Sequence, residues 1–501
     1  MSNTAPEVRS SPVVSRRAWQ SLIVLLAGMF MALLDTTIVN VALPTIRTSL
    51  DASEATLSWI ISGYALAFGL ALIPAGRIGD RVGHKWVFFT GLALFTVASL
   101  ACGLAQNDLQ LIVARVVQGL AGGIFVPAVT AVIQLMFPPM ARGKAFAILG
   151  SVIGVSTALG PIVGGLIIQA FGDENGWRLV FWVNLPIGVI ALIAAARLLP
   201  SRAEASVAGG AAPGTPAPTR IALDWVGLLL VSGGLVALLV PLIEGQDQGW
   251  PSWTMVTLTA GAILIVLFGF WEVAYTKRGL NPIVPPRLFR HPAFTGGVIL
   301  ALVYFAAFTS IFFTISILWQ AGLGHTALES GLVSIPFAIG SIIGASQSNR
   351  LSQLLGRTVL VIGVALVTVG LVWIWLVLLL TPVGDLTNWH LLAPLLIAGL
   401  GSGLFIAPNV QFIVATVDRS EAGAASAVVG VMQRVGSAVG IAVIGSVLFG
   451  SLVVTGPSPD ALASAFTTSA TQAMAVSAAF SVVALVLVFA LPKRVAGRPT
   501  S

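Results

Sequence analysis

Charged residues and cysteines are both scarce in this chain of 501 residues. Only 9% of the residues are charged, whereas a soluble globular domain carries about 25%, so the chain has too little polar surface to stay in solution. The single cysteine, Cys102, excludes an intrachain disulfide and a cysteine-based metal cluster. The four histidines are scattered, and no nucleophile is paired with a base. We therefore expect no metal, no cofactor and no enzymatic activity.

Long apolar runs are what the chain has instead, since 57% of its residues are hydrophobic. A membrane-spanning helix needs about 20 apolar residues, and lipid obliges each span to satisfy its own backbone hydrogen bonds. The sequence therefore predicts an all-α polytopic membrane protein with fourteen spans. The predicted spans are 19–42, 57–76, 86–105, 109–136, 144–169, 179–199, 224–243, 252–274, 294–319, 330–348, 358–380, 389–413, 426–449 and 471–491.

Lysine and arginine are distributed unevenly between the two sides of these spans. With the N-terminus inside, the 25 Lys and Arg all lie in inner segments, except Arg47 and Arg178 outside and Arg115 and Arg434 within spans. Positive charge accumulates on the cytoplasmic side of membrane proteins. This distribution predicts that both termini are cytoplasmic, and it explains the net positive charge without a nucleic-acid partner.

The spans divide into two sets of six, with two additional helices between them. The segment 201–223, rich in Ala, Gly and Pro, is typical of a flexible cytoplasmic linker. Many secondary transporters place the substrate site at the midplane between two six-helix halves. We expect a monomer with the following segments: a cytoplasmic tail at 1–18, a first half at 19–200, the linker, two extra helices at 224–275, a second half at 276–492 and a cytoplasmic tail at 493–501.

Asp35 is a carboxylate within the first apolar run. At about 1.5 Å per residue it lies roughly 24 Å along the helix from Trp19. An unpaired acid at that depth costs at least ~2.5 kcal/mol, and burial disfavours its charged form. Such a group can load and release a proton and can attract a cationic substrate. The alternatives are a structural hydrogen bond or a position among the outer headgroups.

Arg115 is the second charge within an apolar run, and Arg434 is the third. A guanidinium there must face protein or water, so Arg115 is either a brace between the first and fourth helices or part of a proton relay. Arg434, which follows Gln433, is either its counterpart in the second half or a residue of the cytoplasmic mouth. Glu272 lies near the inner end of its span, and we expect its side chain to extend to water.

The fifth apolar run contains Gly160, Pro161, Gly164 and Gly165. Small residues let helices approach closely, and a proline removes a hydrogen bond and bends the helix. The run is either a kinked hinge between the halves or an ordinary packing surface.

A charged segment connects the second and third spans and includes Gly76, Asp80, Arg81, Gly83 and Lys85. So many charges exclude it from lipid, so we expect a tight cytoplasmic turn. Asp80 can cap a helix N-terminus while the basic side chains face anionic lipid. The turn either latches an inner gate or only sets the topology.

These motifs, in this order, resemble the major facilitator superfamily, specifically the fourteen-span drug:proton antiporters of the QacA/EmrB type. The similarity covers five motifs: 34–44 (LDTTIVNVALP), 76–85 (GRIGDRVGHK), 111–119 (LIVARVVQG), 156–165 (STALGPIVGG) and 177–188 (WRLVFWVNLPIG). The segments 399–409 and 433–440 fit the family more loosely. Position 84 is His where the family usually has Arg, and position 156 is Ser where it has Gly.

The resemblance implies a proton-coupled antiporter that exports lipophilic, cationic or neutral, drugs or antibiotics across the bacterial cytoplasmic membrane, driven by the proton gradient alone. Asp35 and Arg115 would couple the proton, and the glycine-proline run would set the direction of transport. Supporting residues would be Asn40, Gln118, Asn184, Gln433 and Arg434.

Three other functions stay open at this stage. They are export of one dedicated amphiphile, proton-coupled uptake and, least in keeping with the sequence, a membrane enzyme. Aromatic side chains can line an apolar cavity for the substrate, and we expect these to be Phe30, Tyr64, Phe125, Trp182 and Phe405.

Overall fold

The computed structural model describes residues 14–52, 54–200, 224–245, 248–280, 282–414, 417, 421–454, 456 and 458–491, and every regular element among them is a helix. The first group of helices is α1 (Arg16–Leu50), α2 (Glu54–Val82), α3 (His84–Leu104), α4 (Asp108–Met136), α5 (Pro139–Trp182) and α6 (Asn184–Leu198). The remaining helices are α8 (Trp225–Glu244), α9 (Ser252–Lys277), α10 (Pro292–Ile317), α11 (Ala327–Leu332), α12 (Ile335–Leu355), α13 (Thr358–Leu380), α14 (Asn388–Val414), α15 (Ala422–Gly450) and α16 (Pro459–Phe489), with short turns at η1 (Pro286–Arg290), η2 (Leu318–Gly322) and η3 (Val383–Asp385). The predicted linker lies outside the described residues.

Thirteen helices in the described part of the chain are long and apolar enough to cross a membrane. Two of these crossings lie within α5 and α6, because Gly172 interrupts the helix with φ 75° and ψ 173°. The fourteenth candidate is α2, whose apolar stretch among the described residues, Trp59–Leu72, is shorter than a span. The chain is a multi-pass membrane protein, and the count of fourteen stays a prediction.

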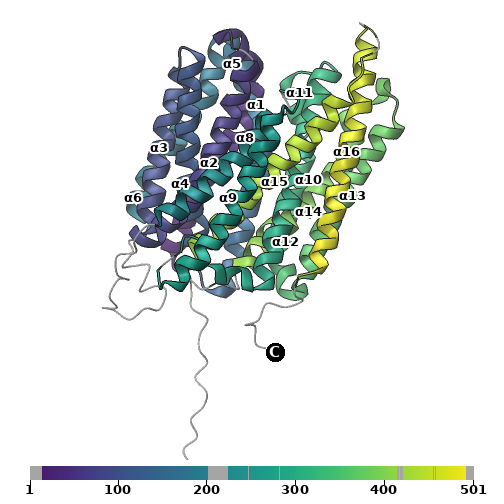
Figure 1. The fold of residues 1–501 in the computed structure, drawn as a ribbon. Helices are drawn as coiled ribbons and strands as arrows, with labels where there is room; N and C mark the ends of the chain where they lie inside the picture. Colours follow the sequence, from purple (N-terminus) through teal and green to yellow (C-terminus); the bar gives the residue numbers. More distant parts are fainter. Residues whose placement is uncertain are drawn as a thin grey trace, which may run out of the picture.

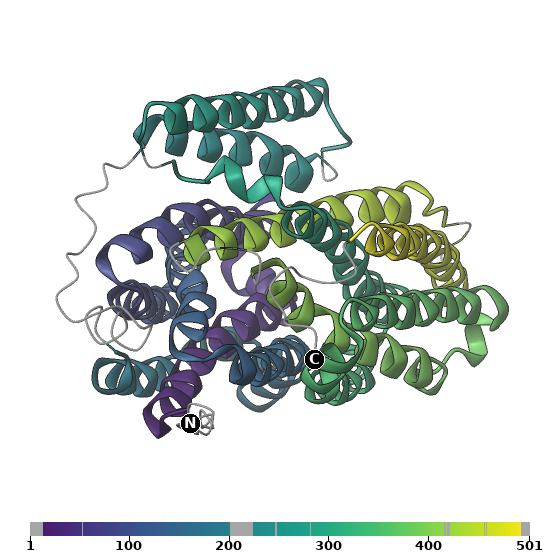
Figure 2. The ribbon, with the colours of Figure 1, turned by 90° about the horizontal axis from the view of Figure 1, so that it is seen from below.

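The helices form two groups that stand side by side, with α8 and α9 outside them (Figures 1 and 2). The outer helix of this pair is α9, on which Val256, Ile263 and Phe270 are 67%, 54% and 72% exposed. Such a row of exposed large apolar side chains is unfavourable in water and suits lipid. The inner helix, α8, packs against α2, where the side chain of Leu239 approaches Gly69.

The two groups share one packing scheme. Gly160 and Gly164 of α5 lie directly against α1, where an added Cβ would approach backbone atoms of α1 within about 3 Å. Gly436 and Gly440 of α15 lie in the same way against the backbone of α10. Pairs of glycines one helical turn apart therefore place α1 against α5 in the first group and α10 against α15 in the second.

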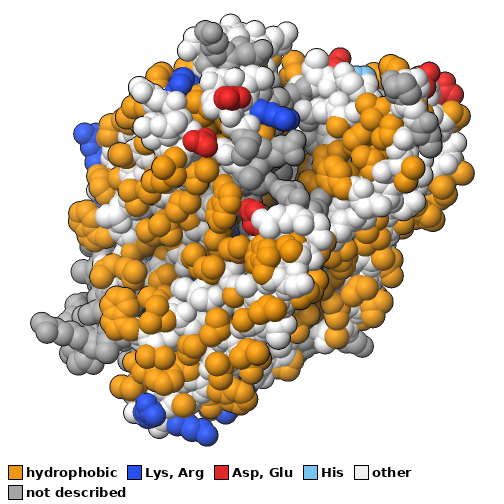
Figure 3. All heavy atoms as spheres, turned by 45° about the horizontal axis from the view of Figure 1, so that its top comes forward, with side chains coloured by type: hydrophobic (Ala, Val, Ile, Leu, Met, Phe, Trp, Pro, Cys, Tyr) orange, Lys and Arg blue, Asp and Glu red, His pale blue; other side chains and the backbone are white. Residues whose placement is uncertain are grey.

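The groups contact each other through α5 on the face where α5 begins. A Cβ built at Gly143 would overlap the side-chain oxygen of Asn349 on α12, and one built at Gly150 would lie 3.1 Å from the Cβ of Ala407 on α14. The opposite face is hollowed between the two groups (Figure 3). The arrangement is therefore closed on the face that carries the ends of α6 and α16 and more open on the other.

The predicted beginning of the last span is wrong because a polar segment continues as helix. The last span was expected from residue 471, but α16 begins at Pro459. Thr467 and Thr471 are buried there, and their hydroxyls donate to the carbonyls of residues one turn earlier. A threonine whose hydroxyl donates to a carbonyl of its own helix, and whose side chain faces protein, can lie within a membrane-spanning helix.

The turn between α2 and α3 is shorter than predicted, because α2 continues to Val82 and α3 begins at His84. Asp80 and Arg81 belong to the last turn of α2, and their side chains lie outside the described part. The N-cap residue of α3 is Gly83, with φ 100°, and the expectation that Asp80 caps a helix N-terminus concerns a side chain outside the described residues. Lys85 donates to the carbonyl of Ala196 at 2.9 Å, which joins this turn to the end of α6.

Glu272 is also placed differently from the prediction. Its side chain is 2% exposed and accepts hydrogen bonds from the backbone N–H groups of Ile283 and Val284, both at 3.2 Å. The expected extension to water is wrong because the segment before η1 folds back against the C-terminal end of α9. The carboxylate therefore holds the connection between α9 and α10.

We expect Glu272→Ala to destabilise this connection measurably. The change leaves two buried N–H donors without their acceptor, and hydrogen bonds to charged groups contribute about 1.5–3 kcal/mol each. The melting temperature of the purified protein should fall by several degrees, whereas Asp385→Ala, at an exposed carboxylate in η3, should leave it unchanged. An unchanged melting temperature for Glu272→Ala would contradict this role.

Candidate functional site

A buried ion pair joins the first and fourth helices. The Nη1 of Arg115 on α4 lies 2.7 Å from the Oδ2 of Asp35 on α1, and the two side chains are 1% and 0% exposed. The Nε of Arg115 also donates to the carbonyl of Ile60 on α2 at 3.1 Å. The brace that the sequence offered as one alternative for Arg115 is therefore present, and Asp35 does not stand unpaired.

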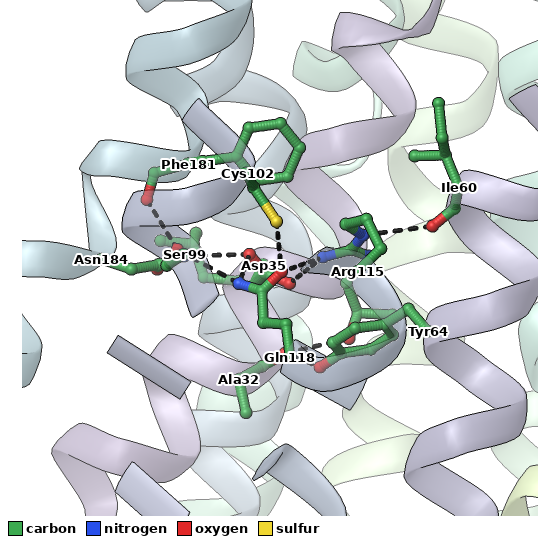
Figure 4. A network of polar contacts seen from close by, with 12 residues as sticks. Ala32, Asp35, Ile60, Tyr64, Ser99, Cys102, Arg115, Gln118, Phe181 and Asn184 are labelled. Carbon is green, nitrogen blue, oxygen red and sulfur yellow. Dashed lines mark hydrogen bonds and ion pairs between the residues drawn. The ribbon is translucent and has the colours of Figure 1, made fainter. Parts of the chain in front are cut away.

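Amide side chains from two further elements complete the surroundings of Asp35 (Figure 4). Its Oδ1 accepts from Gln118 on α4 and from Asn184 at the start of α6, both at 2.9 Å. The same two amides donate to the hydroxyl of Ser99 on α3, at 3.1 and 2.9 Å, and Ser99 donates to the carbonyl of Phe181. The network around this carboxylate thus connects α1, α3, α4 and α6.

Hydrogen-bond donors approach both oxygens of Asp35. Two amide N–H groups point at Oδ1, and one guanidinium N–H group points at Oδ2. All three hydrogen bonds end on one side chain, so Asp35 holds α1 to α4 and α6.

Glycines bring the helices close enough for this network to form. A Cβ built at Gly119 would overlap the carbonyl oxygen of Tyr64, and one built at Gly123 would overlap that of Phe68. This close approach of α4 to α2 lets Arg115 reach the Ile60 carbonyl. It also places the guanidinium 4.1 Å above the ring of Tyr64. Gly119 of the 111–119 motif therefore allows the close approach of α4 to α2 that Arg115 needs to reach the Ile60 carbonyl.

The 177–188 motif contacts the C-terminal ends of α1 and α3, beside the same network. Trp177 is fully buried and donates to the hydroxyl of Ser49 at the end of α1. Arg178 donates to the carbonyls of Gly103 and Ala105 at the end of α3. These contacts hold α1 and α3 on either side of the chain that leads to Asn184.

The glycine-proline run packs on both groups of helices. Gly160 lies against Thr37, two residues beyond Asp35 on α1, and Gly164 lies against Ile38. Pro161 and Gly165 face α11, at Gly331 and Leu328. One helix therefore contacts both the helix that carries Asp35 and the second group.

Some predicted supporting residues lie apart from the pair. Asn40 is exposed on α1 and does not join the network. Gln433 and Arg434 are half-buried on α15, and the guanidinium of Arg434 lies 4.1 Å above the ring of Phe68 on α2. Arg434 therefore lies between the two groups.

The expected aromatic lining is only partly accessible. Tyr64, Phe125 and Phe405 are at most 1% exposed and pack within the helix groups, so they are core residues in this conformation. Phe30 and Trp182 are half-buried. Position along the sequence could not separate these two sets, because both are aromatic residues in apolar runs.

Ser99 is the member of the network that the sequence did not indicate. A single serine in an apolar helix normally bonds to a carbonyl one turn earlier. Ser99 instead donates to α5, through Phe181, and accepts from α4 and α6. Only the tertiary arrangement reveals this role.

The fold and this site define a class of membrane transporter. The family model of the Major Facilitator Superfamily matches residues 25–441, and the chain belongs to that superfamily. It is accordingly a transporter rather than an enzyme.

Several relatives are named for antibiotics. The chain is 36% identical over 447 residues to the probable actinorhodin transporter of Streptomyces coelicolor, covering 88% of this chain and 74% of the relative. It is 32% identical to the tetracenomycin C resistance and export protein of Streptomyces glaucescens, covering 86% and 76%. It is 33% identical to the methylenomycin A resistance protein of Streptomyces coelicolor, covering 85% and 84%.

Solved structures share the fold at low identity. The human organic anion transporter MFSD10 (TETRAN) superposes with a TM-score of 0.61 at 15% identity, covering 96% of this chain and 100% of that one. The proton:xylose symporter XylE superposes with a TM-score of 0.62 at 12% identity, covering 93% and 95%. At these identities the likeness establishes the fold alone.

Proposed function

We propose that this chain is a proton-coupled antiporter that exports lipophilic small molecules, antibiotics among them, across a bacterial cytoplasmic membrane. The observation that carries the proposal is the buried Asp35–Arg115 pair with its amide donors. An acid buried at this depth is costly, and here its protonation state is tied to the contacts between four helices. Export as the direction is supported by the names of the relatives.

The proposed cycle uses the two protonation states of Asp35. When the proton enters from outside, it neutralises the Asp35 carboxylate, which weakens the pair with Arg115 and the contact of α1 with α4. When the proton leaves to the cytoplasm, the pair with Arg115 re-forms and the substrate takes the inward-facing cavity. Each unit of proton gradient supplies about 1.36 kcal/mol per proton. Movement of α1 reaches the second group through α5, which contacts both.

A second candidate is export of one dedicated compound rather than of many. It is favoured by the three relatives described above, each of which is named for a single antibiotic. The fold and the proton site would be the same in both cases. The two differ only in how many compounds are moved.

Flux into everted membrane vesicles tests the proposal. Vesicles that contain the chain, acidified inside, are offered a panel of lipophilic cations, acids and neutral antibiotics. We expect accumulation that an uncoupler abolishes, for several compounds in the multidrug case and for one in the dedicated case. Accumulation that survives the uncoupler, or flux only in the opposite direction, would overturn the proposal.

A further inference from the structure

Arg434 is a cation between the two groups of helices with no acidic partner in the described part of the chain. Its guanidinium lies over the face of the Phe68 ring, 4.1 Å from the ring centroid. A cation over an aromatic face is stabilised, but this contact satisfies none of the five N–H donors of an arginine. The side chain is half-buried, so part of it is accessible.

The depth of Arg434 is close to that of Asp35. Arg434 lies two residues before Gly436, the glycine of α15 that packs on α10. Asp35 lies two residues before Thr37, the residue of α1 that packs against Gly160 of α5. The two glycines hold equivalent places in the two groups. Arg434 therefore lies near the middle of the bundle, where an unpaired charge is expensive.

Arg434 is also connected to the coupling pair through two aromatic rings. The Phe68 ring beneath Arg434 lies 6.0 Å from the Tyr64 ring, and Arg115 lies 4.1 Å above the Tyr64 ring. Arg434 and Arg115, the second of which is paired with Asp35, thus lie over neighbouring aromatic rings of α2. Because Asp35 is neutralised by Arg115, Arg434 is the charge that this region presents to a substrate.

We propose that Arg434 binds the anionic group of the exported molecule, so that the substrates are amphiphiles with a carboxylate, a phenolate or a similar acidic group. This inference rests on the proposed function and refines it. The earlier expectation of a cationic substrate assumed a free Asp35 carboxylate, which the structure does not present. Exchange of an anion for an entering proton moves two units of positive charge inward, so the membrane potential would drive export as well.

Two probe ions of the same shape and opposite charge test this inference. Tetraphenylborate and tetraphenylphosphonium are titrated onto the purified full-length chain in detergent, without a proton gradient, and empty micelles correct for partitioning. We expect the anion to bind about tenfold more tightly than the cation, as an attraction of ~1.4 kcal/mol produces. Arg434→Gln should bring the ratio of the two dissociation constants near one, and Arg434→Lys should keep the preference for the anion.

A matched control separates local charge from net charge. Arg350→Gln removes the same charge at an exposed position near the inner end of α12, and it should leave the ratio unchanged. A ratio that Arg434→Gln does not alter, or a preference of the unmodified chain for the cation, would overturn the inference. A purely structural Arg434 would lower the melting temperature and leave the ratio in place. Loss of proton coupling would instead appear in the vesicle flux, with the ratio unaffected.

Discussion

Asp35→Asn is expected to abolish proton-driven export. Asparagine keeps the size of the side chain but cannot exchange a proton, and it leaves the charge of Arg115 buried without compensation. Breaking a buried ion pair on one side costs about 3–5 kcal/mol. The variant should therefore show both a lower melting temperature and no flux that depends on the pH gradient. Flux is measured in everted vesicles and corrected for the amount of inserted protein.

The double variant Asp35→Asn with Arg115→Gln separates coupling from bracing. Two neutral side chains of similar size can share hydrogen bonds, so most of the lost stability should return. Proton-driven flux should not return, because the site then lacks the carboxylate that the proposed cycle protonates. If the double variant regains both stability and flux, the pair is only a brace and Asp35 does not carry the proton.

Gly160→Val is expected to have the second largest effect. A Cβ at Gly160 would overlap the hydroxyl of Thr37 and lie 2.9 Å from the backbone nitrogen of Ile38. The added side chain therefore pushes α5 away from α1 next to Asp35. Overpacking of this kind costs about 1–3 kcal/mol, and we expect flux per folded protein to fall by about tenfold or more.

A glycine on the outer surface provides the control for that change. Gly269 lies on α9, and a Cβ built there meets no atom within 4 Å. Gly269→Ala should leave flux unchanged and add slightly to helix stability. The role assigned to the α1–α5 contact is wrong if Gly160→Val transports at the rate of Gly269→Ala. A change in the number of protons moved per substrate would further link this contact to coupling.

The helices and the two charges of the pair could be predicted from the sequence. Apolar runs of membrane length carry a strong signal, and Asp35 and Arg115 stand out because lipid excludes unpaired charge. The brace between their helices was one of the stated alternatives, and the structure contains it. The sequence could not predict the hydrogen bonds between helices that are distant in the chain, such as the bonds that Ser99 and Asn184 form.

The errors have physical causes that single residues illustrate. The beginning of α16 was missed because Thr467 and Thr471 satisfy their hydroxyls within the helix and so need no water. Glu272 was expected to reach solvent because hydropathy does not reveal that the chain before η1 folds back over it. Phe125 and Phe405 were assigned to a cavity because the sequence pattern is the same for an aromatic residue in a packed core and for one that lines a cavity.

Proton movement driven by the substrate alone tests the central claim most directly. Proteoliposomes are loaded with the compound that the vesicle panel identifies, at equal pH on both sides, and the internal pH is followed as the compound leaves. Antiport through Asp35 predicts that the interior becomes acidic with the unmodified chain and does not change with Asp35→Asn. An interior that becomes alkaline, or acidification that persists in Asp35→Asn, would contradict the account.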